Sequence, residues 1–173
     1  HGFGACSIND IVKKTNVNRF SLYKEYGNKE GVLQEALNLY QLRYSSNQIA
    51  LLSQDKPIRE VLTQFYSSYF EDTDGHLPGC FIIHISTELA DHNNDIKIKL
   101  DDYLKQIEIA LIELFQKRHF SSHDSKKIAL RLTGLFCNSM CFCLIQSPEE
   151  RISYIEMSLD LILNKITQNG TYA

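Results

Sequence analysis

Eight side chains near the start of the chain have the chemistry needed to contact a nucleic-acid duplex. The groups suited to base edges and thymine methyls belong to four consecutive residues, Asn18, Arg19, Phe20 and Ser21. The groups suited to phosphate oxygens are hydroxyls and ammonium groups, on Ser7, Tyr23, Lys24 and Lys29. Such residues act together only where two short helices and a tight turn hold them on one surface.

The local sequence predicts that pair of helices. Ser7 and Asp10 have the spacing of a capping box that opens a helix through about Lys14. Asn16 tolerates the left-handed conformation of a tight turn, and Asn18 can cap a second helix, from Arg19 to Tyr26. Its inward side is expected to use Leu22, Tyr23 and Tyr26. The spacing fits a DNA-reading helix-turn-helix and equally a helical hairpin packed in a larger core.

The rest of the chain is also predicted to be helical. Only 8 Gly and 3 Pro occur in 173 residues, which favours long helices over a many-stranded fold. Gly27 and Asn28 end the second helix and cap a third, expected from Lys29 to about Leu52. The further helices are expected at 57–70, 80–90, 95–118, 124–145 and 147–169, with a loop at 71–79 and a cap at Asp124.

Composition describes an ordinary globular chain with a charge asymmetry. With 43% hydrophobic and 23% charged residues the chain can bury a core, and no apolar run is long enough to span a bilayer. Residues 1–43 hold six Lys or Arg and four Asp or Glu, giving +2, whereas the remainder holds 12 against 17, giving −5. A basic start on an acidic body suits contact with a polyanion. We expect no membrane association and no export signal.

The stretch GACSINDIVKKTNVNRFSLYKEYGNKEGVLQEALNLY, from Gly4 to Tyr40, resembles the DNA-binding domain of TetR-family bacterial transcriptional regulators. That family typically opens its second helix with Thr or Ser, ends its turn in Gly-Val-Ser, and continues with Leu-Tyr-x-x-Phe and Ser-Lys-Glu. The matching positions here are Ser7, Ile11-Val12, Asn16-Val17-Asn18, Leu22-Tyr23, Tyr26 and Asn28-Lys29-Glu30. The resemblance covers about a fifth of the chain.

The resemblance implies an all-α fold with a helix-turn-helix head at 1–45 and a ligand-binding and dimerisation domain at 46–173. It implies a homodimeric repressor, released from its double-stranded DNA operator by a small-molecule inducer. In such a repressor, Asn18 to Ser21 would face the bases of the operator, while Tyr23, Lys24 and Lys29 would hold its phosphates. The family's first helix would precede Gly2, and this sequence does not contain it. Phe20 and Glu25 depart from the usual residues, so the operator sequence is not carried over.

Two further groups of residues suggest how the body would work. A partly polar, aromatic ligand pocket is predicted from Phe65, Tyr66, Tyr69, His84, Glu88, Tyr103 and Phe136. The alternatives are that His84 pairs with Glu88 structurally and that the aromatic residues are plain core. A dimer interface, or else packing inside one subunit, is predicted from Ile128, Leu132, Leu135, Ile152, Ile155, Leu159 and Ile162.

The five cysteines have no disulfide-framework spacing, which favours a reducing, cytoplasmic compartment. Cys80 follows Pro78-Gly79 at a predicted helix start, where a helix N-terminus lowers a thiol pKa, so Cys80 is a candidate redox sensor. The alternative is a structural cysteine. Cys137, Cys141 and Cys143 have a spacing compatible with a soft metal, but cysteines on an apolar helix are typical small packing residues, so we expect no metal.

Three functions are therefore weighed. The first is an inducer-released repressor, and the second is a thiol-, electrophile- or metal-responsive repressor acting through Cys80. The third is a helical small-molecule-binding protein whose N-terminal hairpin does not bind DNA. The sequence holds no glycine-rich phosphate loop, nucleophile elbow or paired-carboxylate arrangement, so neither an enzyme nor a cofactor is expected.

Overall fold

The computed structural model describes residues 2–70 and 78–168, apart from the side chains of 165–168, and every regular element among them is helical. The helices are α1 (Ile8–Thr15), α2 (Arg19–Tyr26), α3 (Lys29–Tyr40), α4 (Ser46–Ala50), α5 (Ile58–Ser67), α6 (Phe81–Leu89), α7 (Asn94–Gln116), α8 (Ser122–Phe142) and α9 (Pro148–Gln168). The all-α prediction is confirmed. Most of the predicted loop, residues 71–77, lies outside the described residues.

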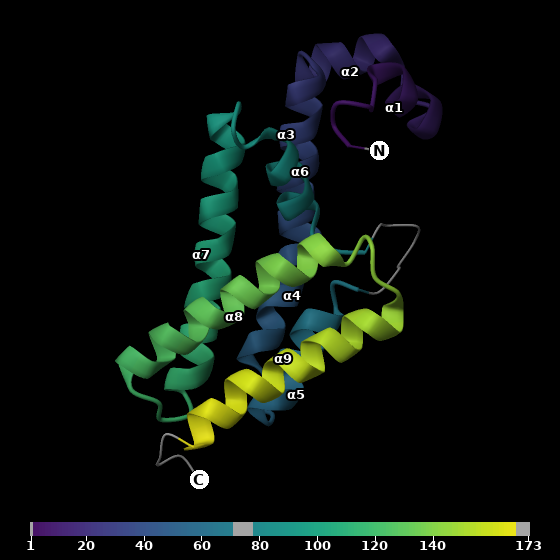
Figure 1. Ribbon diagram of the computed structural model, residues 1–173. Helices are drawn as coiled ribbons and strands as arrows, with labels where there is room; N and C mark the ends of the chain where they lie inside the picture. The colour runs from purple at the N-terminus through teal and green to yellow at the C-terminus, as the bar shows by residue number, and fades with distance from the viewer. Residues whose placement is uncertain (1, 71–77, 169–173) are drawn as a thin grey trace.

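The first two helices form a small head at one end of the molecule (Figure 1). Its turns are fixed by local caps, as predicted. Ser7 and Asp10 form a capping box, and Asn16 adopts the left-handed conformation with φ 56°. The side chain of Asn18 accepts from the backbone N–H of Phe20 at the start of α2. The local sequence therefore fixes where α1 ends and where α2 begins.

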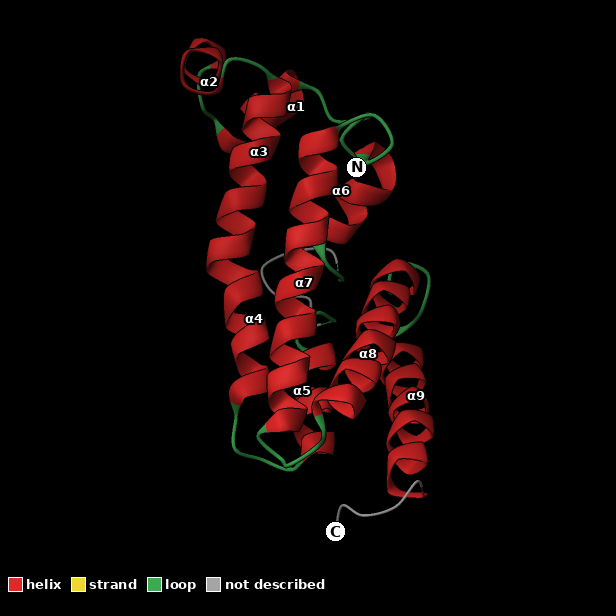
Figure 2. Ribbon diagram, turned by 90° about the vertical axis from the view of Figure 1, so that its left-hand side faces the viewer, coloured by secondary structure: helices red, strands yellow, loops and turns green. Residues whose placement is uncertain are grey.

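A long helical rod connects the head to the body. After α3 the backbone continues through a π-helical turn, Gln41–Ser45, then α4 and a 3₁₀ turn, Leu51–Ser53. Figure 2 shows this rod running beside α7 for much of the length of the molecule. The predicted third helix, Lys29 to Leu52, thus has the right extent. The π-helical turn, which periodicity did not indicate, shifts the register between its two halves.

The body is a bundle in which α7 packs along α8, while α9 covers α5 and α8 (Figure 1). Its largest side chains are almost completely buried, among them Phe65, Tyr66, Tyr103, Phe115 and Phe136. The hydroxyl of Tyr66 donates to the carbonyl of Leu132 at 2.7 Å, so this buried polar group is satisfied. Among the described residues, none of the helices combines the length and the apolarity needed to cross a bilayer.

Two helix starts in the body differ from the sequence prediction. The cap of α8 is Ser121, whose hydroxyl accepts from the backbone N–H of Asp124 at 3.1 Å. The predicted cap Asp124 therefore lies one turn inside the helix, where its carboxylate accepts from the Ser121 hydroxyl. Pro57 precedes α5 as its N-cap residue and does not lie within its first turn.

The predicted dimer-interface residues require a correction. Ile128, Leu132, Leu135, Ile155 and Leu159 are at most 8% exposed, because they pack α8 and α9 onto the rest of the same subunit. Ile162 is partly buried against that core, and Ile152 alone of the seven is exposed, at 45%. A second copy of the chain cannot reach the five buried side chains. The periodicity identified the inner face of these helices.

Candidate DNA-binding head

Helix α2 presents almost its whole surface to solvent. Asn18, Arg19, Phe20 and Ser21 are all exposed, and Phe20 reaches 74%. Leu22 is the one buried residue of α2. The expectation that Tyr23 and Tyr26 point inward is wrong, since they are 40% and 36% exposed. The exposed start of α2 has the size and polarity of a helix end that could enter a major groove about 12 Å wide.

A groove beside α2 brings several predicted residues together. This head groove has a volume of about 380 Å³ and lies where the starts of α1 and α3 approach α2. Its lining residues are Gly4, Ala5, Cys6, Ser7, Ile8, Asn9, Arg19, Tyr23 and Lys29. The guanidinium of Arg19 donates to the Asn9 amide oxygen and to the Tyr23 hydroxyl, each at 3.4 Å. Asn9, which the sequence analysis missed, therefore orients Arg19 from α1.

The electrostatics of the head groove favour an anion. The N-terminus of α1 lines it together with Lys29, the first residue of α3, and helix N-termini carry partial positive charge. Arg19 adds a full charge. The Ser7 hydroxyl is already used, because it donates to the Asp10 carboxylate at 2.6 Å. That bond and the Ser7 backbone N–H hold the pKa of Asp10 below its usual value, so an anion would compete with this carboxylate for Ser7.

Lys29 has a structural partner in addition to its predicted phosphate role. Its ammonium group donates to the carbonyl of Phe3 and lies 4.0 Å from the centre of the Phe3 ring. The side chain is consequently only partly exposed and holds the N-terminal segment against α3. Lys24, in the last turn of α2, is exposed and remains the simpler candidate for a phosphate contact.

The predicted ligand pocket in the body is filled by its own aromatic rings. Phe65, Tyr66, Tyr69, Tyr103 and Phe136 are all at most 2% exposed. The ring centres of Tyr69 and Phe136 are 4.9 Å apart, and those of Phe65 and Tyr66 are 5.3 Å apart. The hydroxyls of Tyr69 and Tyr103 hydrogen-bond at 2.9 Å. The five residues do come together, as a closed aromatic cluster, and a ligand would have to separate these rings to bind there.

His84 and Glu88 have different partners, although they lie one turn apart on α6. The His84 ring nitrogen Nε2 lies 3.0 Å from the carbonyl of Met140 on α8. The Glu88 carboxylate accepts from the backbone N–H groups of Phe3 and Gly4, at 2.7 and 2.5 Å. Glu88 therefore faces the N-terminal segment, away from the aromatic cluster to which the sequence analysis assigned it.

Cys80 is the N-cap residue of α6, where the sequence predicts it, but its thiol is fully buried. Its sulfur donates to the Tyr103 hydroxyl at 3.5 Å. Burial raises the pKa of the Cys80 thiol, and the backbone N–H groups of the helix start only partly offset this effect. The expectation of a lowered pKa is therefore wrong, because desolvation outweighs the helix N-terminus. In the described part of the chain, no three His, Cys, Asp or Glu side chains form a group that could hold a metal.

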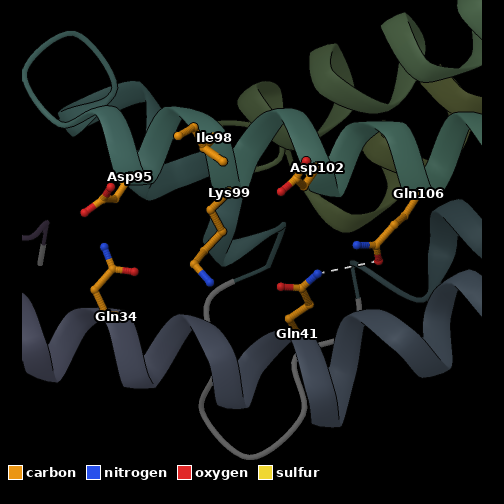
Figure 3. A pocket seen from close by; sticks show the side chains of 7 residues that line it. All are labelled: Gln34, Gln41, Asp95, Ile98, Lys99, Asp102 and Gln106. Carbon is orange, nitrogen blue, oxygen red and sulfur yellow. Dashed lines mark hydrogen bonds between the residues drawn. The ribbon is translucent and has the colours of Figure 1, made fainter.

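A second groove lies between the rod and α7, about 320 Å³ in volume (Figure 3). This α3–α7 cleft is mainly polar, and its lining residues are Gln34, Gln41, Asp95, Ile98, Lys99, Asp102 and Gln106. The Gln41 amide donates to the Gln106 amide oxygen at 3.5 Å across it, and the Lys99 ammonium donates to Asn38 at 2.7 Å. None of the predicted ligand-binding residues lines this cleft.

The fold and the head groove together define a protein with a helix-turn-helix head on an all-helical body. Residues 1–36 match the family model for bacterial regulatory proteins of the tetR family. The HTH-type transcriptional repressor ComR of Escherichia coli (strain K12) is 31% identical over 100 residues. That match spans about half of each protein, 56% of this chain and 47% of ComR. The head is thus similar to the DNA-binding domain of TetR-family transcriptional regulators.

Solved structures share the fold over most of the described chain. A cysteine mutant of the TetR-family regulator CifR, in a structure that contains double-stranded operator DNA, covers 91% of this chain and 87% of its own, with a TM-score of 0.76 and 16% identity. A TetR regulator from Legionella pneumophila covers 98% and 88%, with a TM-score of 0.68 and 14% identity. A TetR regulator of Rhodococcus sp. RHA1 has a TM-score of 0.60 at 17% identity, covering 92% and 90%.

Proposed function

We propose that this chain is a homodimeric repressor that binds double-stranded operator DNA through its head and is released by a small molecule. The observation that carries the proposal is the exposed start of α2, Asn18 to Ser21, beside a groove with the charge to hold a phosphate. The ComR relative is named as a transcriptional repressor, and the CifR structure contains operator DNA, which supports the same role for this chain.

The head divides naturally into base-reading and phosphate-holding groups. Arg19 is fixed by Asn9 and Tyr23 yet remains exposed, so its guanidinium is positioned to pair with a guanine edge. Phe20 projects further and could contact a thymine methyl. Lys24 and the helix N-termini in the head groove are left to hold phosphates, which supply affinity without sequence information.

A second copy of the chain has an apolar surface to bind. Residues Leu130, Gly134, Cys141, Met157 and Leu161 are exposed on α8 and α9, and we refer to them as the α8–α9 face. Leu130 and Leu161 are 65% and 69% exposed, and Gly134 has open space on its side-chain side. Pairing of two such faces about a twofold axis would give an isologous four-helix bundle. The two heads would then meet half-sites about 34–36 Å apart.

Release by a small molecule requires that the ligand bind more tightly to an arrangement of heads that does not fit the operator. The closed aromatic cluster remains the proposed ligand site, with its rings moving apart to admit an apolar molecule. Modification of Cys80 is a second candidate trigger, but the buried thiol would have to become exposed before it could react.

Fluorescence anisotropy with DNA from the region flanking the coding sequence tests the proposal. We expect salt-dependent binding that survives competitor DNA, and Arg19→Ala should weaken it by about 10- to 100-fold and relax the sequence preference. Lys126→Ala, on α8 in the body, is the matched loss of one positive charge and should leave binding unchanged. If the wild type prefers none of these sequences to competitor DNA, the chain is instead a helical protein without this role.

A further inference from the structure

A carboxylate of the body is hydrogen-bonded to the N-terminal segment that leads into the head. Glu88, in the last turn of α6, uses one oxygen for the backbone N–H of Phe3 and the other for that of Gly4. The bond from Phe3, at 2.7 Å, has the length of a charge-assisted hydrogen bond, and the bond from Gly4 is at least as close. Figure 2 shows the start of the chain lying beside α6. We call this two-bond contact the Glu88 latch.

The segment around the latch leaves room for the carboxylate because it is rich in glycine. A Cβ atom added at Gly2 would lie 2.6 Å from one Glu88 oxygen, and one at Gly4 would lie 3.1 Å from the other. The first distance is closer than real Cβ contacts allow, so a side chain at Gly2 would displace Glu88. The backbone can therefore approach the carboxylate closely because Gly2 has no side chain.

The opposite side of the same segment is held by α3. Lys29 donates to the carbonyl of Phe3, while the neighbouring N–H groups are bound to Glu88. Residues 2–4 are thus held between the start of α3 and the end of α6. Three residues further on, Ser7 caps α1, whose Asn9 orients Arg19. A short chain of direct contacts connects α6 with the DNA-facing side chain.

The other parts of α6 are anchored in the body. Its N-cap residue Cys80 donates to Tyr103 of α7, and His84 lies within hydrogen-bonding distance of the Met140 carbonyl of α8. Gly79, directly before α6, packs so closely that an added Cβ would lie 2.5 Å from the sulfur of Cys143. A helix seated this tightly holds Glu88 at a fixed place relative to the body.

We propose that Glu88 is a positioning residue that fixes the orientation of the head relative to α6. The inference rests on the proposed function for its consequence at the operator. Glu88 touches neither base nor phosphate in this scheme. Its effect on DNA affinity comes from holding the head ready to bind.

The variant Glu88→Gln tests this inference because electrostatics alone predicts the opposite sign. Removal of a negative charge should tighten DNA binding slightly, whereas loss of the latch should weaken it, by about tenfold. The slope of log affinity against log salt concentration should stay the same, since no phosphate contact is lost. Asp91→Asn, three residues further along, removes the same charge and should not weaken binding. Unchanged or tighter binding by Glu88→Gln would overturn the proposal.

The variant Gly2→Ala disrupts the Glu88 latch by changing the N-terminal segment and not the carboxylate. Alone it should weaken operator binding, and in combination with Glu88→Gln it should add little, because both changes break one contact. Full additivity of the two effects would count against the latch.

Amide hydrogen exchange in the full chain without DNA keeps this test separate from that of the proposed function. Glu88→Gln should speed exchange at Phe3, Gly4 and α1, and leave α7 and α8 unchanged. Unaltered exchange at Phe3 and Gly4 would refute the latch even if the wild type binds DNA. If the wild type binds no operator, the proposed function fails, and exchange alone decides whether Glu88 orders the head.

Discussion

Truncation of Leu161 should weaken the dimer that we propose, by an amount that follows from its exposure. The side chain is 69% exposed in the subunit, and complete burial of a leucine side chain contributes about 1.5–3 kcal/mol. Leu161→Ala should therefore remove about 1 kcal/mol per subunit. An isologous interface contains the residue twice, so the dimer should lose about 2 kcal/mol, a change of about 30-fold in its dissociation constant.

Sedimentation equilibrium over a dilution series measures that constant directly. Ile109→Ala is the matched control, because Ile109 is 55% exposed on α7 and lies outside the α8–α9 face. Leu132→Ala distinguishes the effect of the buried face of α8 from the effect of the exposed α8–α9 face. Leu132 is fully buried, so its truncation should lower the free energy of unfolding by about 2–5 kcal/mol without a comparable effect on dimerisation of the folded chain. Equal dissociation constants for wild type and Leu161→Ala would refute this assignment of the interface.

Two further predictions concern the cysteines. Burial raises the pKa of the Cys143 thiol from 9.0 to about 11. As the pH rises, the unfolded chain therefore loses this proton before the folded chain does. The free energy of unfolding should consequently fall between these two pH values, by about 2–3 kcal/mol. Urea titrations at several pH values would show this loss, and an equally steep loss in Cys143→Ala would contradict it. At neutral pH, iodoacetamide should label partly exposed Cys6 well before buried Cys80, and mass spectrometry showing equal rates in the native protein would contradict the burial argument.

The parts of the fold that could be predicted from sequence are those set by neighbouring residues. The caps at Ser7, Asn18 and Asn28 each use a side chain that bonds a backbone N–H two or three residues away, so they depend little on the rest of the chain. The left-handed Asn16 is likewise a local choice. The local sequence therefore predicts where α1 and α2 begin and end, but it does not predict the inward face of α2, since Tyr23 and Tyr26 are exposed.

The inward and outward faces of α8 and α9 could not be assigned in the same way. Both faces of each helix carry apolar residues, with Leu132 and Leu159 inside and Leu130 and Leu161 outside. Periodicity shows that an apolar stripe exists, but whether it meets the same subunit or a second copy depends on how α5 and α7 pack. Most of the residues that the sequence predicts at the dimer interface belong to the apolar stripe that fills the core of the same subunit.

Cys80 and Glu88 show a different limit, since their behaviour depends on groups that lie far away in sequence. The helix start at Cys80 was predicted correctly, yet its thiol pKa follows from burial against Tyr103, which sequence position alone does not reveal. Glu88 sits one turn from His84, which invited a local pairing, but its partners are 84 and 85 residues away. Charged side chains at the end of an apolar helix are therefore best interpreted only after every backbone N–H near them has been located. In this chain those N–H groups belong to the segment that leads into the DNA-binding head, which is why a residue assigned to a ligand pocket becomes the candidate for fixing the head relative to α6.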